Sequence, residues 1–184
     1  MRLMLDDLVI APLAADDVPA FVAYRSDPDV ARYQSWSPDY SDDDARQLVE
    51  GQAGSDFPEA GEWMQFGIRS SSGDLLGDVA VHVFDDQPDT YELGVTVSPA
   101  AQRRGIARAA LGATIDHLVS ERGAHRVILT LDERNAPMRR VCATLGLRHE
   151  GTARDADWFK GEWTTVETWA VLGSEWGLKR EREA

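Results

Sequence analysis

The sequence predicts an α/β (α+β) fold: a mixed, mostly antiparallel central sheet of about seven strands flanked by about four helices. Strand-like apolar runs alternate with segments of helical apolar spacing, and neither a linker nor an internal repeat interrupts this order. The chain has 184 residues, of which 43% are hydrophobic, and this is enough for one core. We therefore expect a single domain over residues 1–184.

The N-terminal part is expected to contain one strand and two helices. Residues 8–13 form a short apolar strand. Asp16 occupies the position of a helix N-cap before an apolar stripe. Ser41, with Asp44 three residues later, resembles a capping box and predicts a second helix through Val49.

The middle of the chain is expected to form three strands. A turn of serine, glycine and aspartate separates strands over 64–69 and 75–84. A third apolar strand over 91–97 ends at a turn that contains Pro99.

The last part of the chain is expected to alternate helices with strands. Apolar residues at one-face spacing predict a helix over 105–122, which Gly123 ends. A further helix begins at Asn135 as its N-cap and stops at Gly146. The remaining strands are expected over 125–131, 147–155 and 163–172.

The most informative segment is the basic loop Gln102-Arg103-Arg104-Gly105-Ile106-Ala107, which joins a strand to a helix. The first N–H groups of a helix have no intrahelical partner and lie at the positive end of its dipole, which favours bound phosphate. Gly105 has no Cβ and lets a ligand approach the backbone, while Arg103, Arg104 and Arg108 add positive charge. The loop predicts a site for a cofactor that carries a diphosphate.

Two common phosphate-binding loops do not fit this segment. The P-loop ending of glycine, lysine and serine or threonine is absent, and the dinucleotide pattern needs three spaced glycines where this loop has Gly105 alone. The loop, with the strand Glu-Leu-Gly-Val-Thr-Val over 92–97, instead resembles the acetyl-coenzyme A (acetyl-CoA) loop of the GCN5-related N-acetyltransferases (GNAT), Gln/Arg-x-x-Gly-x-Gly/Ala. The resemblance implies a GNAT-type sheet with a splayed cofactor cleft, acetyl-CoA as co-substrate and an amine as acceptor.

Within the family, the chain is most similar to the RimJ/RimL-like branch. Members of that branch carry a Tyr-Arg-x-x-Pro-x-Val segment, which is residues 24–30 here. They often end in a tryptophan-bearing last strand followed by Glu-Trp, which correspond here to Trp169 and to Glu175-Trp176.

The composition limits which partners, cofactors and locations are expected. The net charge of −13 argues against nucleic-acid binding and favours a cationic substrate, although solubility alone also explains it. The N-terminus lacks a basic segment followed by a long apolar run, and no stretch approaches about 20 apolar residues, so we expect neither a signal peptide nor a membrane segment. The single cysteine excludes an internal disulfide and fits a reducing, cytoplasmic compartment. The four histidines show no metal-ligand spacing, so we expect no metal.

Transfer of an acetyl group from a thioester to an amine needs a base, because an amine such as lysine, with a pKa of about 10.4, is protonated at neutral pH. Glu92 is the candidate base. Strand alternation puts Glu92, Gly94 and Thr96 on one face, which could point into the acceptor cleft. An exposed glutamate in a surface ion pair is the alternative interpretation.

The resemblance also assigns the cofactor contacts. Backbone groups near Val95 and Val97 would pair with the pantetheine arm in the manner of an added strand. Asn135 would contact the pantetheine or the acetyl region in addition to capping its helix. The expected cofactor-binding residues are Val95, Thr96, Val97, Gln102, Arg103, Arg104, Gly105, Ile106, Ala107, Arg108 and Asn135.

At the positions where the family has the acid that protonates the leaving thiolate, this sequence departs from the family pattern. Many members have a tyrosine seven residues after that asparagine, where this chain has Cys142, and some have a serine three residues after it, where this chain has Met138. Cys142 is the candidate acid because a thiol's pKa of about 8.5 is close to that of the leaving group. A packed thiol is the simpler account, and catalysis without a dedicated acid also stays open.

Three tryptophans are candidates for the acceptor site. Trp36, Trp158 and Trp163 fall in segments that border the acceptor cleft in the family, so they are expected to line it. Core packing or a dimer contact is the alternative for such residues, and a homodimer therefore stays open.

These observations favour an acetyl-CoA-dependent N-acetyltransferase that acts by direct transfer in a ternary complex. The acceptor would be a primary amine, either a protein N-terminus or a small molecule. The alternative is a non-catalytic coenzyme A-binding sensor or scaffold, because neither usual acid is present.

Overall fold

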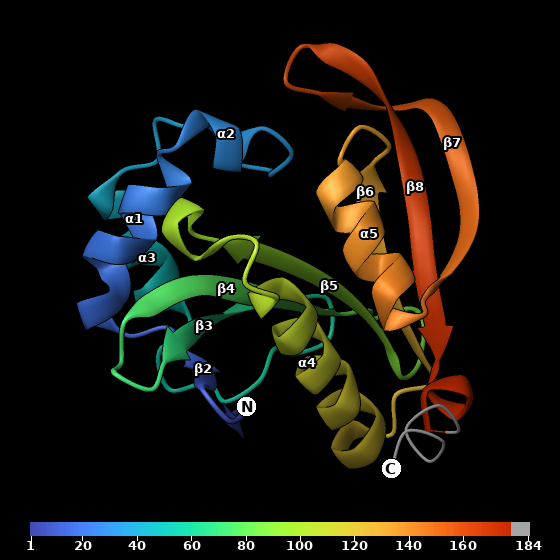
Figure 1. Ribbon diagram of the computed structural model, residues 1–184, viewed down its shortest axis with the longest axis horizontal. Coiled ribbons are helices and arrows are strands. Elements are labelled where there is room, and N and C mark those ends of the chain that lie inside the picture. The colour runs from blue at the N-terminus through green and yellow to red at the C-terminus, as the bar shows by residue number, and fades with distance from the viewer. Residues whose placement is uncertain (178–184) are drawn as a thin grey trace.

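In the computed structural model, which describes residues 1–177, one continuous sheet runs through the molecule (Figure 1). Its strands are β1 (Leu3–Met4), β2 (Leu8–Pro12), β3 (Trp63–Ser70), β4 (Leu75–Val83), β5 (Thr90–Val97), β6 (Arg126–Asp132), β7 (Arg148–Phe159) and β8 (Glu162–Leu172). They lie in the order β1-β2-β3-β4-β5-β6-β8-β7. All neighbours are antiparallel except β5 and β6, which are parallel. The predicted mixed, mostly antiparallel sheet is confirmed.

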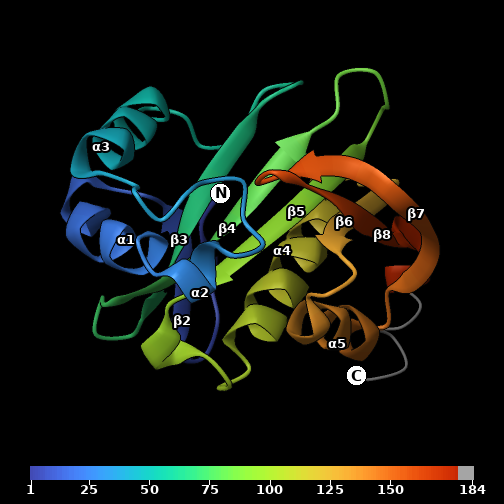
Figure 2. The same cartoon turned by 90° about the horizontal axis from the view of Figure 1, so that it is seen from above.

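Helices cover both faces of the sheet (Figures 1 and 2). They are α1 (Val18–Arg25), α2 (Pro28–Ala31), α3 (Asp42–Gly51), α4 (Ile106–Arg122) and α5 (Ala136–Leu145), with short 3₁₀ turns at Ala15–Asp17 and Pro99–Ala101. A sixth α-helix starts at residue 173. The apolar faces of α4 and α5 pack in the main core with β3–β6, while α1 and α3 enclose a second, smaller core.

The helix boundaries follow the local signals in the sequence. The Ser41 hydroxyl accepts from the Asp44 N–H, and the Asp44 carboxylate accepts from the Ser41 N–H, so the capping box at α3 is confirmed. The Asn135 Oδ1 accepts from the Met138 N–H at 3.2 Å and caps α5. Gly123 adopts the left-handed conformation with which α4 ends.

Two boundaries differ from the prediction. Asp16 is not the N-cap of the first helix: the 3₁₀ turn starts after Ala14, and the Asp17 carboxylate accepts from the Ala14 N–H at 2.7 Å. Asp17 also binds the Arg69 guanidinium, a partner 52 residues away that local spacing does not reveal. Strand β7 runs to Phe159, four residues beyond the predicted end, because it keeps pairing with β8.

A buried polar cluster fixes α1 to the sheet. The Tyr24 hydroxyl donates to one Asp78 oxygen at 2.7 Å, and the Arg25 guanidinium lies 3.5 Å from the other. The Arg25 guanidinium is also stacked between aromatic rings, with Trp36 at 3.8 Å and Phe21 at 4.1 Å. Burial raises the pKa of Asp78, and the Arg25 charge opposes this rise.

The parallel pair β5 and β6 separates along its length. Thr90, Tyr91 and Glu92 pair with β6, and no later residue of β5 does. On its other side, β5 remains paired with β4 as far as Val97. The stretch from Leu93 to Val97 therefore presents an unpaired backbone edge, which is the splayed opening expected of the fold.

Candidate active site

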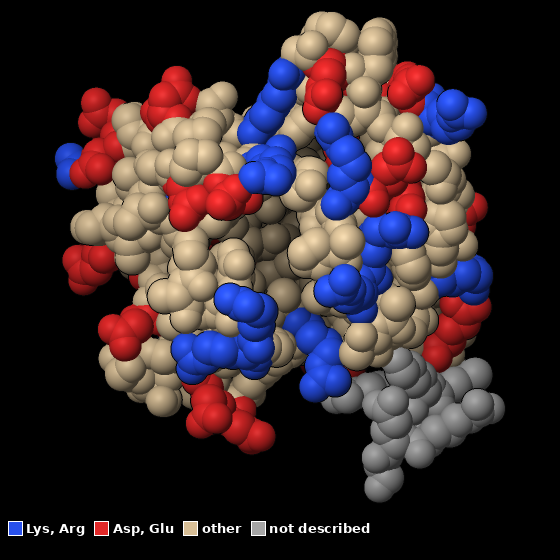
Figure 3. Space-filling model, turned by 45° about the horizontal axis from the view of Figure 1, so that its top comes forward, with Lys and Arg blue, Asp and Glu red and all other residues tan. Residues whose placement is uncertain are grey.

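A cleft of about 560 Å³ lies where β5 and β6 separate. Its walls come from α2, the C-terminal half of β5, the loop that leads into α4, and the first turns of α4 and α5. Figure 3 shows it as a deep hollow with basic side chains gathered along part of its rim. It collects all the predicted cofactor-binding residues except Arg104: Val95, Thr96, Val97, Gln102, Arg103, Gly105, Ile106, Ala107, Arg108 and Asn135.

One end of the cleft is the start of α4. Gly105 is the N-cap with a φ of 79°, a left-handed conformation that glycine adopts without strain, and no side chain caps the helix there. An added Cβ at Gly105 would meet nothing within 4 Å, so the space in front of the helix start is open. Arg103 is also left-handed, with a φ of 60°. The first backbone N–H groups of α4, which have no intrahelical partner, are therefore exposed to a ligand in the cleft.

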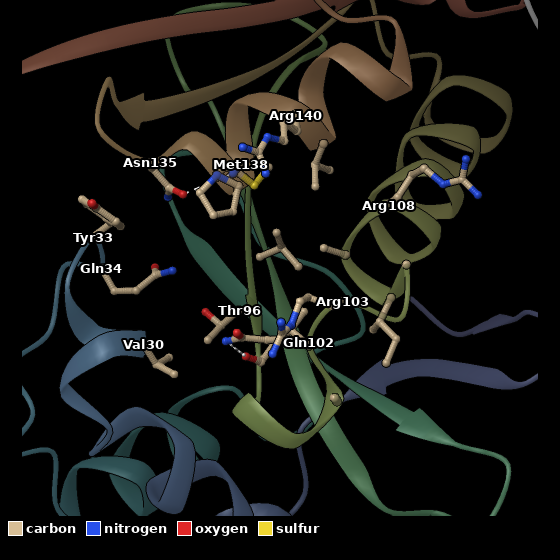
Figure 4. Close-up of a pocket in the computed structure, with 18 of the residues that line it drawn as sticks. Val30, Tyr33, Gln34, Thr96, Gln102, Arg103, Arg108, Asn135, Met138 and Arg140 are labelled. Carbon is tan, nitrogen blue, oxygen red and sulfur yellow. Dashed lines mark hydrogen bonds between the residues drawn. The ribbon is translucent and has the colours of Figure 1, made fainter.

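Three arginines line this end of the cleft: Arg103, Arg108 and Arg140 (Figure 4). The sequence reasoning missed Arg140, which is on α5, 35 residues after Gly105. Its only sequence signal is its position on the helix that Asn135 caps. Arg104 is exposed and does not line the cleft.

Helix α2 and the segment after it form the opposite wall. Val30, Tyr33 and Gln34 line the cleft there, and Tyr33 and Gln34 lie on the side nearer to Asn135 in Figure 4. The sequence reasoning did not name them, although Val30 closes the Tyr-Arg-x-x-Pro-x-Val segment. Asp27 fixes this wall locally, because its carboxylate accepts from the Asp29 N–H and caps α2.

Strand β5 supplies the floor of the cleft. Val95, Thr96 and Val97 belong to the unpaired edge, so their backbone groups on that side are free of sheet hydrogen bonds. Thr96 is cross-strand from Asp78, and thus the buried polar cluster lies beside this floor on the same face of the sheet. Gln102 donates to the Val97 carbonyl at 3.2 Å and fixes the turn that follows.

Glu92 lies at the vertex of the opening, because it is the last β5 residue that pairs with β6. Its cross-strand neighbour on β4 is His82, and both are half-buried. The buried His82 Nδ1 has no hydrogen-bond partner among the described residues. Glu92 is not part of the cleft wall.

Cys142 is fully buried on the core side of α5 and does not line the cleft. Burial raises the pKa of its thiol to about 12. Such a thiol is a weaker acid than an ordinary one and is out of contact with a ligand in the cleft. Its position indicates a packing role.

The three candidate tryptophans do not come together. Trp36 stacks on Arg25, and its indole N–H donates to the Arg25 carbonyl. Trp158 and Trp163 form a cross-strand pair near the end of the β7–β8 hairpin, with ring centroids 5.3 Å apart, and are about 60% exposed. None of the three lines the cleft.

Two other features are absent from residues 1–177. No group of three or more His, Cys, Asp or Glu side chains in that range is arranged to hold a metal ion. Within the same range, no helix combines the length and apolarity that crossing a membrane requires.

The comparisons with known proteins agree with this geometry. The chain is 27% identical over 179 residues to the uncharacterized N-acetyltransferase YnaD of Bacillus subtilis, covering 96% of this chain and 99% of that protein. It is 30% identical over 157 residues to the mycothiol acetyltransferase of Acidothermus cellulolyticus, covering 68% of this chain and 47% of that protein.

Solved structures share the fold. A GNAT-family acetyltransferase from Bacillus anthracis superposes with a TM-score of 0.85 at 26% identity, covering 95% of this chain and all of that one. Spermidine N-acetyltransferase from Vibrio cholerae, in complex with CoA and spermine, superposes with a TM-score of 0.80 at 17% identity, covering 94% and 99%. The family model "Acetyltransferase (GNAT) domain" matches residues 7–148. The chain therefore belongs to the GNAT acetyltransferase family.

Proposed function

We propose that this protein transfers the acetyl group of acetyl-CoA directly to a primary amine in a ternary complex. The observation that carries the proposal is the arrangement of the cleft. One end is an uncapped helix start beside three arginines, and the floor is an unpaired strand edge. The first suits a diphosphate, and the second suits an extended arm that carries amide groups.

Different residues of the cleft would bind different parts of the cofactor. The N–H groups from Gly105 to Arg108 would donate to the pyrophosphate, with Arg103 and Arg140 near its charges. The backbone of Val95 and Val97 would pair with the pantetheine amides. The loop shape, rather than the exposed Arg104 side chain, would matter at that position.

Asn135 would serve two purposes. Its Oδ1 caps α5, which leaves the amide NH₂ group available for the cofactor. Thr96 and Met138 would shape the space around the acetyl group, since both line the cleft.

Bound acetyl-CoA supplies an activated thioester carbonyl and a thiolate leaving group. Glu92 would remove a proton from the acceptor ammonium, directly or through a water, from its position at the vertex of the opening. Because Cys142 is buried outside the cleft, the thiolate would leave without a dedicated acid.

Several finer assignments belong to the same proposal. The Tyr-Arg-x-x-Pro-x-Val segment supports membership of the RimJ/RimL-like branch. The continuous sheet is compatible with a single domain over residues 1–184. The single cysteine supports a cytoplasmic location. The exposed pair Trp158 and Trp163 is compatible with a homodimer contact, which light scattering would test.

The decisive experiment is thiol release from acetyl-CoA across an amine panel of peptide N-termini, amino acids, polyamines and aminoglycosides. We expect release above the rate without acceptor for one class of amine. Tight acetyl-CoA binding with no transfer to any amine would contradict the proposal and favour the non-catalytic sensor or scaffold.

A further inference from the structure

Lys160 occupies a turn that does not suit a lysine. It forms, with Gly161, the two-residue loop between Phe159 of β7 and Glu162 of β8. Both loop residues have positive φ, 50° and 87°, as in a type I′ turn. Asparagine, aspartate or glycine is favoured at the first position, because other residues are strained in the left-handed conformation. An unfavourable residue in such a turn suggests that its side chain has a role.

The Lys160 side chain bridges two distant parts of the chain. Its ammonium group donates to the Trp36 carbonyl at 2.7 Å and to the Ala31 carbonyl, which are 124 and 129 residues earlier in the sequence. Ala31 and Trp36 bracket Tyr33 and Gln34, which line the cofactor cleft. The hairpin tip is therefore fixed to the wall of the cleft formed by the α2 segment (Figure 2).

Two further contacts complete a ring over this side of the molecule. The Tyr33 hydroxyl donates to the Arg134 carbonyl at 3.3 Å. The Arg134 guanidinium donates to Glu162, next to the hairpin turn, at 2.8 Å. The α2 segment, the loop between β6 and α5, and the hairpin tip are thus each joined to the other two.

A small cavity of about 130 Å³ lies beside this ring, and Tyr33 forms a wall of both this cavity and the cofactor cleft. The other walls include Thr130 and Asp132 of β6, and Asp157 and Phe159 of the hairpin. Its volume is close to the roughly 150 Å³ of a cavity that holds benzene. The Asp132 carboxylate is paired with the Arg134 guanidinium at 2.6 Å, so the exposed Asp157 carboxylate is the one that favours a positively charged occupant.

We propose that Lys160 is a positioning residue that closes the acceptor side of the cleft and restricts the acceptor to small amines. The inference rests on the proposed acetyltransferase function and names the class of its acceptor. An amine at the end of a polypeptide needs an opening through which the rest of the chain leaves the site. The bridge from Lys160 to Ala31 and Trp36 joins the hairpin tip to the α2 segment, and in this proposal it would obstruct that route.

Lys160→Asn removes the bridge without disturbing the turn, because asparagine suits the left-handed position but is too short to reach Ala31 and Trp36. The matched control is Arg154→Asn, which removes one positive charge from the same hairpin at an exposed residue that makes no hydrogen bond or ion pair with the described residues. Each variant is assayed with an alkyl diamine, an amino-acid amide and a peptide with a free N-terminus. The KM for acetyl-CoA and the kcat are measured in parallel.

Wild type is expected to acetylate the small amines and not the peptide. Lys160→Asn should raise the KM for the small amines about tenfold and shift the small-amine-to-peptide ratio of kcat/KM at least tenfold toward the peptide. The KM for acetyl-CoA should not rise, and the free energy of unfolding should not fall. Lys160→Arg, which keeps donors of similar reach, should retain most of the wild-type ratio, and Arg154→Asn should retain all of it.

Equal ratios in Lys160→Asn, Arg154→Asn and wild type would overturn the inference and leave the acetyltransferase proposal intact. Wild type that prefers the peptide would do the same. If wild type transfers to no amine, both proposals fail together.

Discussion

The two ends of the cleft are built in different ways. The start of α4 depends on consecutive residues: β5 leads through Gln102–Gly105 into the helix, and Gly105 supplies the conformation that the turn requires. The acceptor side depends on contacts of Lys160 with Trp36 and of Tyr33 with Arg134, and each pair joins residues far apart in the sequence. The cofactor end can therefore be recognised from a short motif, whereas the acceptor end exists only after the chain has folded.

Gly105→Glu should have the largest effect on the cofactor end. A carboxylate in the open space before α4 would oppose the phosphates and add strain at a φ of 79°. We expect acetyl-CoA affinity to fall by about 100-fold or more in calorimetric titrations, since the lost attraction becomes repulsion. Gly105→Ala adds the same backbone strain, of about 1–2 kcal/mol, without the charge.

Retained affinity in Gly105→Glu would mean that the phosphates do not bind at this helix start. Equal losses in Gly105→Ala and Gly105→Glu would show that backbone conformation alone, and not charge, matters there.

Asp78→Asn tests the support of the acceptor end. It leaves the Arg25 charge buried without its carboxylate, and breaking a buried ion pair in this way costs about 3–5 kcal/mol. Urea denaturation measures the free energy of unfolding. The control is Asp42→Asn in the exposed pair Arg46–Asp42, where the loss should stay below about 1 kcal/mol. If Asp78→Asn lowered the free energy of unfolding by no more than Asp42→Asn does, the aromatic rings around Arg25, and not Asp78, would stabilise the Arg25 charge.

The sequence predicts local structure well where one short segment determines it. The capping box at Ser41 and the cap at Asn135 each join residues three apart, so their spacing is sufficient. The Asp16 prediction was wrong by one position. The carboxylate that makes the structural contacts is that of Asp17, because it binds Arg69 of the distant strand β3. The end of β7 was missed because its pairing with β8, rather than its own composition, sets its length.

The same distinction applies to the site. The cofactor residues come from one strand and the loop after it, and all except Arg104 line the cleft. Lys160 and Tyr33 carry no motif, and their roles follow from partners about 100 or more residues away. Trp36 was expected to line the acceptor site, but the structure shows it stacked on Arg25. A family resemblance places such a residue in a region, and only its contacts show what it does.

Glu92→Gln probes the vertex of the opening, where β5 and β6 begin to separate. Losing a general base should lower kcat by about 100-fold, while the KM for acetyl-CoA stays unchanged. The deficit should shrink as the pH approaches about 10, because an amine of lysine type then loses its proton without assistance. Thiol-release assays from pH 7 to pH 10 would show this trend, with the exposed Glu59→Gln as control. A deficit that stays constant with pH would contradict the role as base.

Cys142→Ala should have the smallest effect on turnover, because the thiol is fully buried and outside the cleft. We expect kcat within about twofold of wild type and a stability loss near 1 kcal/mol, typical of a modest core truncation. A fall of kcat by tenfold or more with unchanged stability would instead make Cys142 the acid.

The dependence of the free energy of unfolding on alkaline pH gives a second test of the same residue. The native thiol has a pKa of about 12, above that of a thiol in the unfolded chain, so the native state holds its proton more tightly. Raising the pH from about 9 to 12 therefore favours unfolding through this group, since the unfolded chain loses the proton first. Cys142→Ala should lose less stability than wild type over that interval in urea titrations. An identical pH dependence in the two proteins would place the thiol in a less buried environment than the core around α5.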